Sequence, residues 1–99
     1  MFEILVALEV TDEEAYSAYR AAMTPILEGY GGAFRFDVVV AKTLRGDFPG
    51  PINRLFAIRF PDAATKERFF ADPAYRRVKD AHFARGARGV AILAEYAVA

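Results

Sequence analysis

The segment from residue 54 to residue 75, RLFAIRFPDAATKERFFADPAY, constrains the fold of this chain most strongly. Residues 55–60 are dense in Phe, Ile and Leu, which is typical of a buried strand. The proline that follows ends the strand, and Asp62 is a good N-cap for a helix that begins one residue later. Asp72 and Pro73 repeat the signal, because Asp caps well and Pro is tolerated at the first helical position. The segment therefore predicts a strand followed directly by two helical pieces.

The flanking segments predict three further strands and one further helix. Alternating apolar residues indicate the strands, and apolar residues spaced by threes and fours indicate the helix. Thr11 and Glu14 form a Thr-x-x-Glu capping box at the start of that helix. Residues 43–53 are rich in Gly and Pro and too numerous for a tight hairpin. The predicted elements are strands over residues 2–10, 33–42 and 90–96 and a helix over 12–28, and the last helical piece ends near Gly86.

The order strand, helix, strand, strand, helix, strand is the ferredoxin-like βαββαβ pattern of an α+β fold with an antiparallel four-stranded sheet. The length of 99 residues fits a single domain over residues 1–99. Each strand has one apolar face, and we expect these faces to lie under the helices. The residues of those faces are Phe2, Ile4, Val6, Leu8 and Val10, then Phe34, Phe36, Val38 and Val40, then Phe56, Ile58 and Phe60, and finally Val90, Ile92 and Tyr96.

The opposite face of the predicted sheet mixes apolar and charged side chains. Hydrophobic residues make up 55% of the chain, which is much apolar surface for so short a domain. A face of mixed character on a small sheet suits a contact with a second copy of the chain. We therefore expect a homodimer through the sheet face. The charged residues assigned to this face are Glu3, Glu9, Arg35, Asp37, Arg59 and Glu95.

Three short motifs are similar to those of a known group of proteins. They are Tyr30-Gly31-Gly32, Phe60-Pro61-Asp62 and Asp72-Pro73-Ala74-Tyr75. With them the chain resembles, over nearly its whole length, small bacterial domains of unknown function in the dimeric α/β-barrel superfamily. There two ferredoxin-like subunits pack their sheets face to face into a barrel with the helices outside, so the resemblance implies a dimeric α/β barrel. The superfamily includes cofactor-free monooxygenases, muconolactone isomerases and haem-dependent chlorite dismutases.

Composition argues against several classes of function. Lys and Arg number 13 and Asp and Glu number 13, so no net positive charge attracts nucleic acid or an anionic membrane. The chain has no cysteine and one histidine, too few of the usual ligands for a metal centre. No apolar run reaches the length of a membrane span and no basic leader precedes the first strand, so we expect a soluble, cytoplasmic protein. We expect no cofactor, with haem on the single histidine as an alternative.

The candidate catalytic residues are His82, Tyr75 and Arg59. His82 is the only side chain whose ordinary pKa lies near neutrality, and its spacing places it on the helix face of Tyr75 and Val78. It is therefore the candidate general acid or base, with Arg59 as an electrostatic clamp for a carboxylate or enolate. The alternative is a structural histidine without a catalytic partner.

The candidate ligand-binding residues are Arg35 and Asp37 on the mixed sheet face and Tyr16 and Tyr19 on the first helix. Arg35 would bind an anionic group together with Arg59, and the tyrosines would contact an aromatic ligand. The alternative is that the charged residues pair with one another across the dimer and the tyrosines belong to the core.

These residues lead to three hypotheses about function. The first is a small homodimeric protein of unknown biochemical role with a small-molecule pocket between helices and sheet. The second is a cofactor-free enzyme, monooxygenase-like or isomerase-like, that acts on a small aromatic or carboxylated metabolite with His82 as acid or base. The third is a dimer that binds a ligand without turnover.

Overall fold

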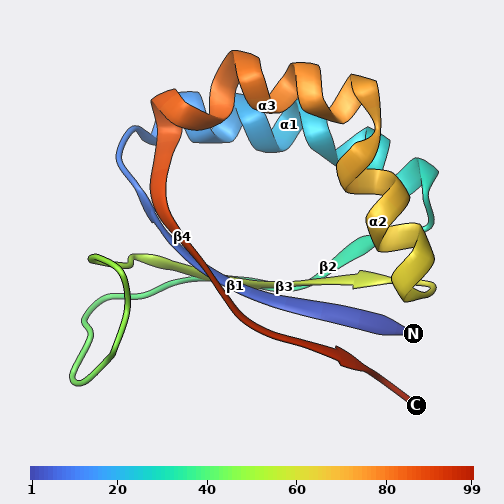
Figure 1. The fold of residues 1–99 in the computed structure, drawn as a ribbon. Helices are drawn as coiled ribbons and strands as arrows, with labels where there is room; N and C mark the ends of the chain where they lie inside the picture. Colours follow the sequence, from blue (N-terminus) through green and yellow to red (C-terminus); the bar gives the residue numbers. More distant parts are fainter.

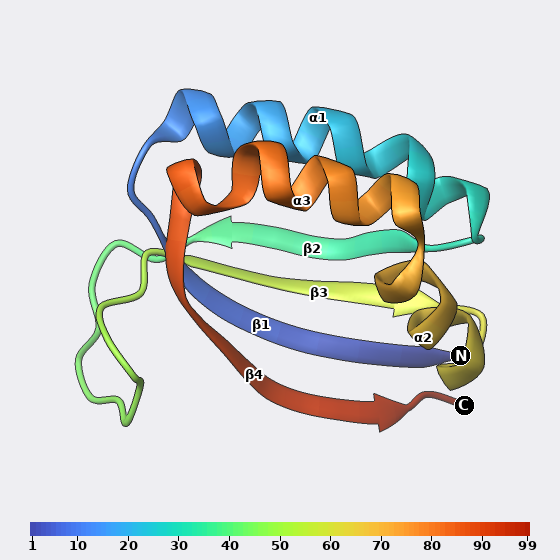
Figure 2. The same cartoon turned by 45° about the horizontal axis from the view of Figure 1, so that its top comes forward.

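The computed structural model describes residues 1–99 and has the predicted ferredoxin-like topology (Figure 1). The antiparallel sheet has the strand order β2-β3-β1-β4 and is open at both edges in the single chain. All three helices lie over one face of the sheet, and the other face is bare (Figures 1 and 2). None of them has the length and apolar character of a membrane span. The elements are β1 (Phe2–Val10), α1 (Glu13–Gly29), β2 (Ala33–Val39), β3 (Arg54–Phe60), α2 (Ala63–Ala71), α3 (Pro73–Gly86) and β4 (Ala87–Ala97).

The starts of α2 and α3 confirm the predicted caps. The Asp62 carboxylate accepts a hydrogen bond from the backbone N–H of Thr65 at 2.7 Å. The Asp72 carboxylate accepts one from the N–H of Ala74 at 2.7 Å, and Pro73 occupies the first helical position. Each aspartate satisfies a backbone donor that the first helical turn leaves free, so two helices form where one long helix would otherwise continue.

The start of α1 differs from the prediction by one residue. Asp12, not Thr11, is the N-cap, and its carboxylate accepts from the N–H of Ala15 at 3.1 Å. The capping box of Thr11 with Glu14 was therefore wrong. The backbone N–H of Thr11 instead donates to the carbonyl oxygen of Gly86 at 2.8 Å, which joins the start of α1 to the end of α3.

The core lies between the helices and the inner face of the sheet, as the strand patterns of β1 and β3 predict. On α1, Leu27 is fully buried, whereas Ala15 and Ala22 are only partly buried. The core residues of the sheet are Ile4, Val6, Leu8, Val10, Phe56, Ile58, Phe60 and Ala87, and those of the helices are Tyr16, Tyr19, Met23, Leu27, Phe69 and Tyr75.

A β-bulge changes the faces of β2. Phe34 lies opposite Ile58, but the register shifts before Phe36, so that Asp37 lies opposite the buried Phe56. The extra residue of a bulge reverses the alternation of faces beyond it. Asp37 therefore lies on the helix side and Phe36 and Val38 on the bare face, so the predicted orientations of these three residues were wrong. The strand also ends at Val39, three residues earlier than predicted.

A second bulge changes the faces of β4. The partners of Leu5 and Val6 on β4 are separated by one extra residue, Leu93. Beyond it Glu95 lies opposite the inward-facing Ile4, and Tyr96 lies on the bare face. The predicted faces of Glu95 and Tyr96 were therefore reversed.

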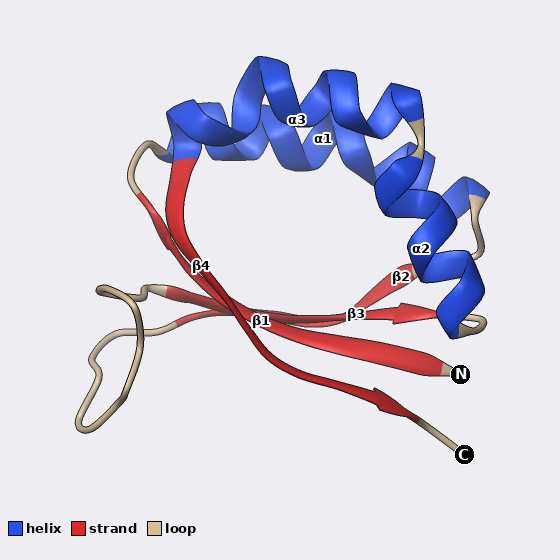
Figure 3. Ribbon diagram, in the orientation of Figure 1, coloured by secondary structure: helices blue, strands red, loops and turns tan.

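The long connection between β2 and β3 extends beyond the end of the sheet as an exposed loop (Figure 3). Its end is fixed by Asn53, whose side-chain oxygen accepts from the N–H of Val10 at 2.7 Å and whose amide donates to the Val10 carbonyl at 3.0 Å. This pair of bonds imitates a strand pairing and holds the loop base against β1.

Candidate functional site

A cavity of about 350 Å³, here called the central cavity, lies between the inner face of the sheet and the helices. Its wall is mostly apolar, and β1, β3, β4, α1, α2 and α3 all contribute to it. A space of this size and character is at the lower end of the range of small-molecule sites. Representative wall residues are Val6, Ile58, Met23, Phe70, Phe83 and Ile92.

Two tyrosine hydroxyls provide the polar group of this wall. The hydroxyl of Tyr19 on α1 lies 2.8 Å from that of Tyr75 on α3, and both residues are 5% exposed. Burial raises the pKa of Tyr19 and also that of Tyr75, so both hydroxyls keep their protons at neutral pH. One proton makes the hydrogen bond between the two rings. The other is a spare donor for a group in the cavity.

Charged residues line the cavity beside α2, α3 and β4. The Lys66 ammonium contacts Glu95 at 2.6 Å and Glu67 at 2.9 Å. The hydrogen bonds that Lys66 donates to Glu95 and Glu67 raise its pKa. Lys79 also lines the cavity, but it forms no salt bridge. The charged residues of the cavity therefore include one cation without a counterion.

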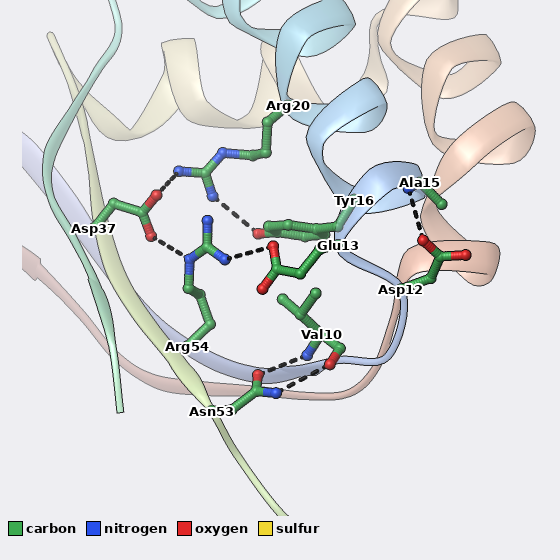
Figure 4. Close-up of polar contacts among 9 residues, drawn as sticks. All are labelled: Val10, Asp12, Glu13, Ala15, Tyr16, Arg20, Asp37, Asn53 and Arg54. Carbon is green, nitrogen blue, oxygen red and sulfur yellow. Dashed lines mark hydrogen bonds and ion pairs between the residues drawn. The ribbon is translucent and has the colours of Figure 1, made fainter. Parts of the chain in front are cut away.

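The predicted ligand-binding residues Tyr16 and Asp37 lie elsewhere, in a charged cluster between α1, β2 and β3 (Figure 4). Asp37 accepts from Arg20 at 2.5 Å and from Arg54 at 3.1 Å. The Tyr16 hydroxyl accepts from Arg20 at 2.9 Å, and Arg54 lies 3.7 Å from Glu13. Burial raises the pKa of Tyr16. These groups satisfy one another, so we interpret the cluster as a link between helix and sheet.

The predicted arginines Arg35 and Arg59 lie on the bare face and share one carboxylate, Glu3. Glu3 accepts from Arg59 at 2.7 Å, from Arg35 at 3.2 Å and from the hydroxyl of Tyr96 at 2.9 Å. Its side chain is fully covered. Burial alone raises the pKa of Glu3, but the hydrogen bonds from Arg59 and Tyr96 and the two positive charges outweigh it and hold the pKa below its ordinary value. The charges pair within one chain.

His82 does not line the central cavity. It lies in a shallow depression at the start of α1, beside Asp12, Glu14 and Arg85. Tyr75 lies in the core and Arg59 on the bare face, so one chain does not bring the three predicted catalytic residues together. No group of three His, Cys, Asp or Glu side chains is arranged to hold a metal ion.

The sequence prediction did not include Lys79, Lys66 and Arg20 among the functional residues. A signal for Lys79 exists, because Tyr75, Lys79 and Phe83 are spaced by four and so follow one face of α3 into the cavity wall. Lys66 had no comparable signal, since its partner Glu95 was assigned to the other face of the sheet.

Comparisons with known proteins agree with the fold. Solved structures that resemble the chain include a protein of unknown function from Rhodopseudomonas palustris (TM-score 0.79, 18% identity, 99% of this chain and 82% of that one). An uncharacterized NIPSNAP domain protein from Burkholderia xenovorans has a TM-score of 0.69 and 18% identity over 100% and 95% of the two chains. A dimeric ferredoxin-like protein of unknown function from Jannaschia sp. CCS1 has a TM-score of 0.57 and 24% identity over 98% of each chain.

A search among curated proteins finds no match. A family model does match, over residues 4–96, which is nearly the whole chain, and its description is a domain of unknown function. The chain belongs to this family, DUF1330.

Proposed function

We propose that the protein is a homodimer that binds a small, largely apolar molecule in the central cavity of each subunit. The observation that carries the proposal is the cavity itself, an apolar space of about 350 Å³ with one pair of hydroxyls in its wall. Binding sites for small molecules combine this kind of apolar wall with a few polar groups that orient the ligand.

The bare sheet face supports the dimer. Strand pairing places apolar side chains in two rows across it, one through Phe36, Ala57, Leu5 and Ala94 and one through Val38, Leu55, Ala7 and Ala91. The Glu3 cluster forms a third, polar row beside them. Apolar rows with a satisfied polar group at their side are typical of a sheet face that packs against another sheet. The Jannaschia protein with the same fold is described as dimeric.

The residues that line the cavity favour ligand binding without turnover as the first hypothesis. A cofactor-free enzyme that uses His82 would need this histidine beside the ligand, and His82 lies in another depression. The one carboxylate that lines the cavity, Glu95, is already held by Lys66. An enzymatic alternative would have to rely on the two tyrosine hydroxyls and Lys79.

Binding to the cavity can be tested with 2-naphthol, a neutral aromatic probe, and a variant that blocks the entrance. Ile92 lines the cavity and is 60% exposed, so Ile92→Trp places a large ring at the opening without removing a core residue. The matched control is Val39→Trp, because Val39 is 73% exposed on β2 and does not line the cavity. Native mass spectrometry of the purified protein would also report any retained small molecule.

We expect saturable binding of 2-naphthol by the wild type and by Val39→Trp, and a loss of about tenfold or more in affinity for Ile92→Trp. Circular dichroism checks that both variants are folded. Absence of binding to the wild type, together with a native mass equal to that of the bare chains, would rule out the proposed pocket. Equal binding by the two variants would place the ligand elsewhere.

A further inference from the structure

We propose that the ligand of the central cavity is a small apolar acid and that Lys79 binds its carboxylate. The inference rests on the proposed function, since it names the class of molecule that the same cavity takes. It starts from the charges of the cavity wall, where two cations and one anion accompany apolar side chains.

The three charged residues differ in what they have free to offer. Lys66 contacts two carboxylates, Glu95 and Glu67, so its single positive charge is more than balanced within the protein. Glu95 in turn is occupied by Lys66. Lys79 has no salt-bridge partner, and its three N–H donors are available to a bound molecule. Lys79, whose side chain is exposed at the edge of the cavity, is therefore the charged residue of the wall without a partner, and its position favours an anion over a cation.

The position of Lys79 on α3 defines how the anion would lie. Tyr75 is one turn before Lys79 and Phe83 one turn after it, and all three line the cavity. A rise of about 6 Å separates neighbouring members of this row along the helix axis. A carboxylate at Lys79 would thus have the apolar body of its molecule against Phe83, Met23 and the sheet, with the spare tyrosine proton one turn away.

The apolar wall makes this contact selective. A carboxylate at the edge of the cavity keeps part of its hydration and gains a charged hydrogen bond, which is stronger than a neutral one. An acid with a second charge at its far end would have to bury that charge among Val6, Ile58 and Phe56, where nothing balances it. The cavity therefore favours monocarboxylates with an apolar body over dicarboxylates and amino acids.

The experiment compares 2-naphthoate with its neutral isostere 2-naphthamide by isothermal titration calorimetry at neutral pH. We expect the wild type to bind the acid about tenfold or more tightly than the amide, and high salt to reduce this preference. Lys79→Met should remove the preference by weakening the acid and leaving the amide unchanged. Lys79→Arg, which keeps the charge, should retain it.

Lys42→Met is the matched control, because it removes one positive charge from the exposed loop and should retain the preference for the acid. Equal affinity of the wild type for the acid and the amide would overturn the inference and leave the proposed pocket intact, as would an undiminished preference in Lys79→Met. If neither probe binds and 2-naphthol does not bind either, the proposed function itself fails.

Discussion

At the scale of single residues, the pair of Tyr19 and Tyr75 is the group whose contribution can be measured most directly. Both rings are almost completely buried, and each hydroxyl has the other as its only partner. Replacing one tyrosine by Phe leaves the other hydroxyl unsatisfied in an apolar wall, which costs about 1–3 kcal/mol of unfolding free energy. Replacing both removes the two polar groups together, which is close to neutral.

We therefore predict that Tyr19→Phe and Tyr75→Phe each lower the free energy of unfolding by about 1–2 kcal/mol, while the double variant loses no more than either single variant. Urea denaturation of the wild type, the two single variants and the double variant at one protein concentration gives the double-mutant cycle. Additive losses would mean that water in the cavity, rather than the opposite hydroxyl, satisfies each tyrosine.

At the scale of elements, the contact between α1 and α3 depends on one residue without a side chain. A Cβ on Gly86 would lie 2.5 Å from the backbone nitrogen of Tyr16 and 2.7 Å from its Cα. Because those atoms belong to a helix backbone, no rotamer change can relieve the overlap. The sequence predicts that the last helical piece ends near Gly86, and α3 does end there. The structure adds that Gly86 allows close packing against α1.

We predict that Gly86→Ala lowers the free energy of unfolding by about 2 kcal/mol or more, since overpacking in a filled contact usually costs about 1–3 kcal/mol. Gly29→Ala is the matched control, because nothing lies within 4 Å of a Cβ at Gly29. Both changes restrict the unfolded chain equally. The difference between the unfolding free energies of the two variants, from urea denaturation, is thus the cost of the steric overlap. Similar denaturation curves would show that α1 and α3 can move apart without a loss of stability.

The elements themselves could be predicted from the sequence, but the faces of two strands could not. The caps at Asp62 and Asp72 depend on local chemistry, which the sequence contains. The bulges near Arg35 and Leu93 depend on how each strand pairs with its neighbour, and no local pattern announces them. Each bulge reverses the faces of the residues after it, so Asp37 and Arg35 lie on opposite faces of the sheet and not on the same face as predicted.

The candidate site was predictable only in part for a related reason. Helical spacing placed His82 on nearly the same face as Tyr75, but seven residues separate the two by about 10 Å along the axis. The row of α3 residues that lines the central cavity continues past this level to Phe83, whereas His82 lies beside that row and faces the depression at the start of α1. Spacing along one helix determines direction, whereas the extent of a cavity depends on all the elements around it.

At the scale of the whole molecule, the bare sheet face decides whether the protein is a dimer. Neighbouring residues of β2 provide a matched test. Val38 lies opposite Leu55 on the bare face and is 45% exposed, whereas Val39 lies opposite Arg54 on the helix side and is 73% exposed. A lysine at either position is tolerated by the single chain, because both side chains are exposed at a sheet edge.

We predict that the wild type and Val39→Lys are dimers at micromolar concentration and that Val38→Lys shifts the equilibrium toward monomer by about tenfold or more. The reason is that a lysine ammonium at position 38 would lie within an apolar row of the dimer contact, where it would be desolvated without a partner. Sedimentation equilibrium of the three proteins measures their dimer dissociation constants. A monomeric wild type would contradict the proposed dimer through the sheet face. If Val39→Lys disrupted the dimer and Val38→Lys did not, the interface would lie on the helix side of the sheet. A partner there would cover the approach to the charged cluster around Asp37.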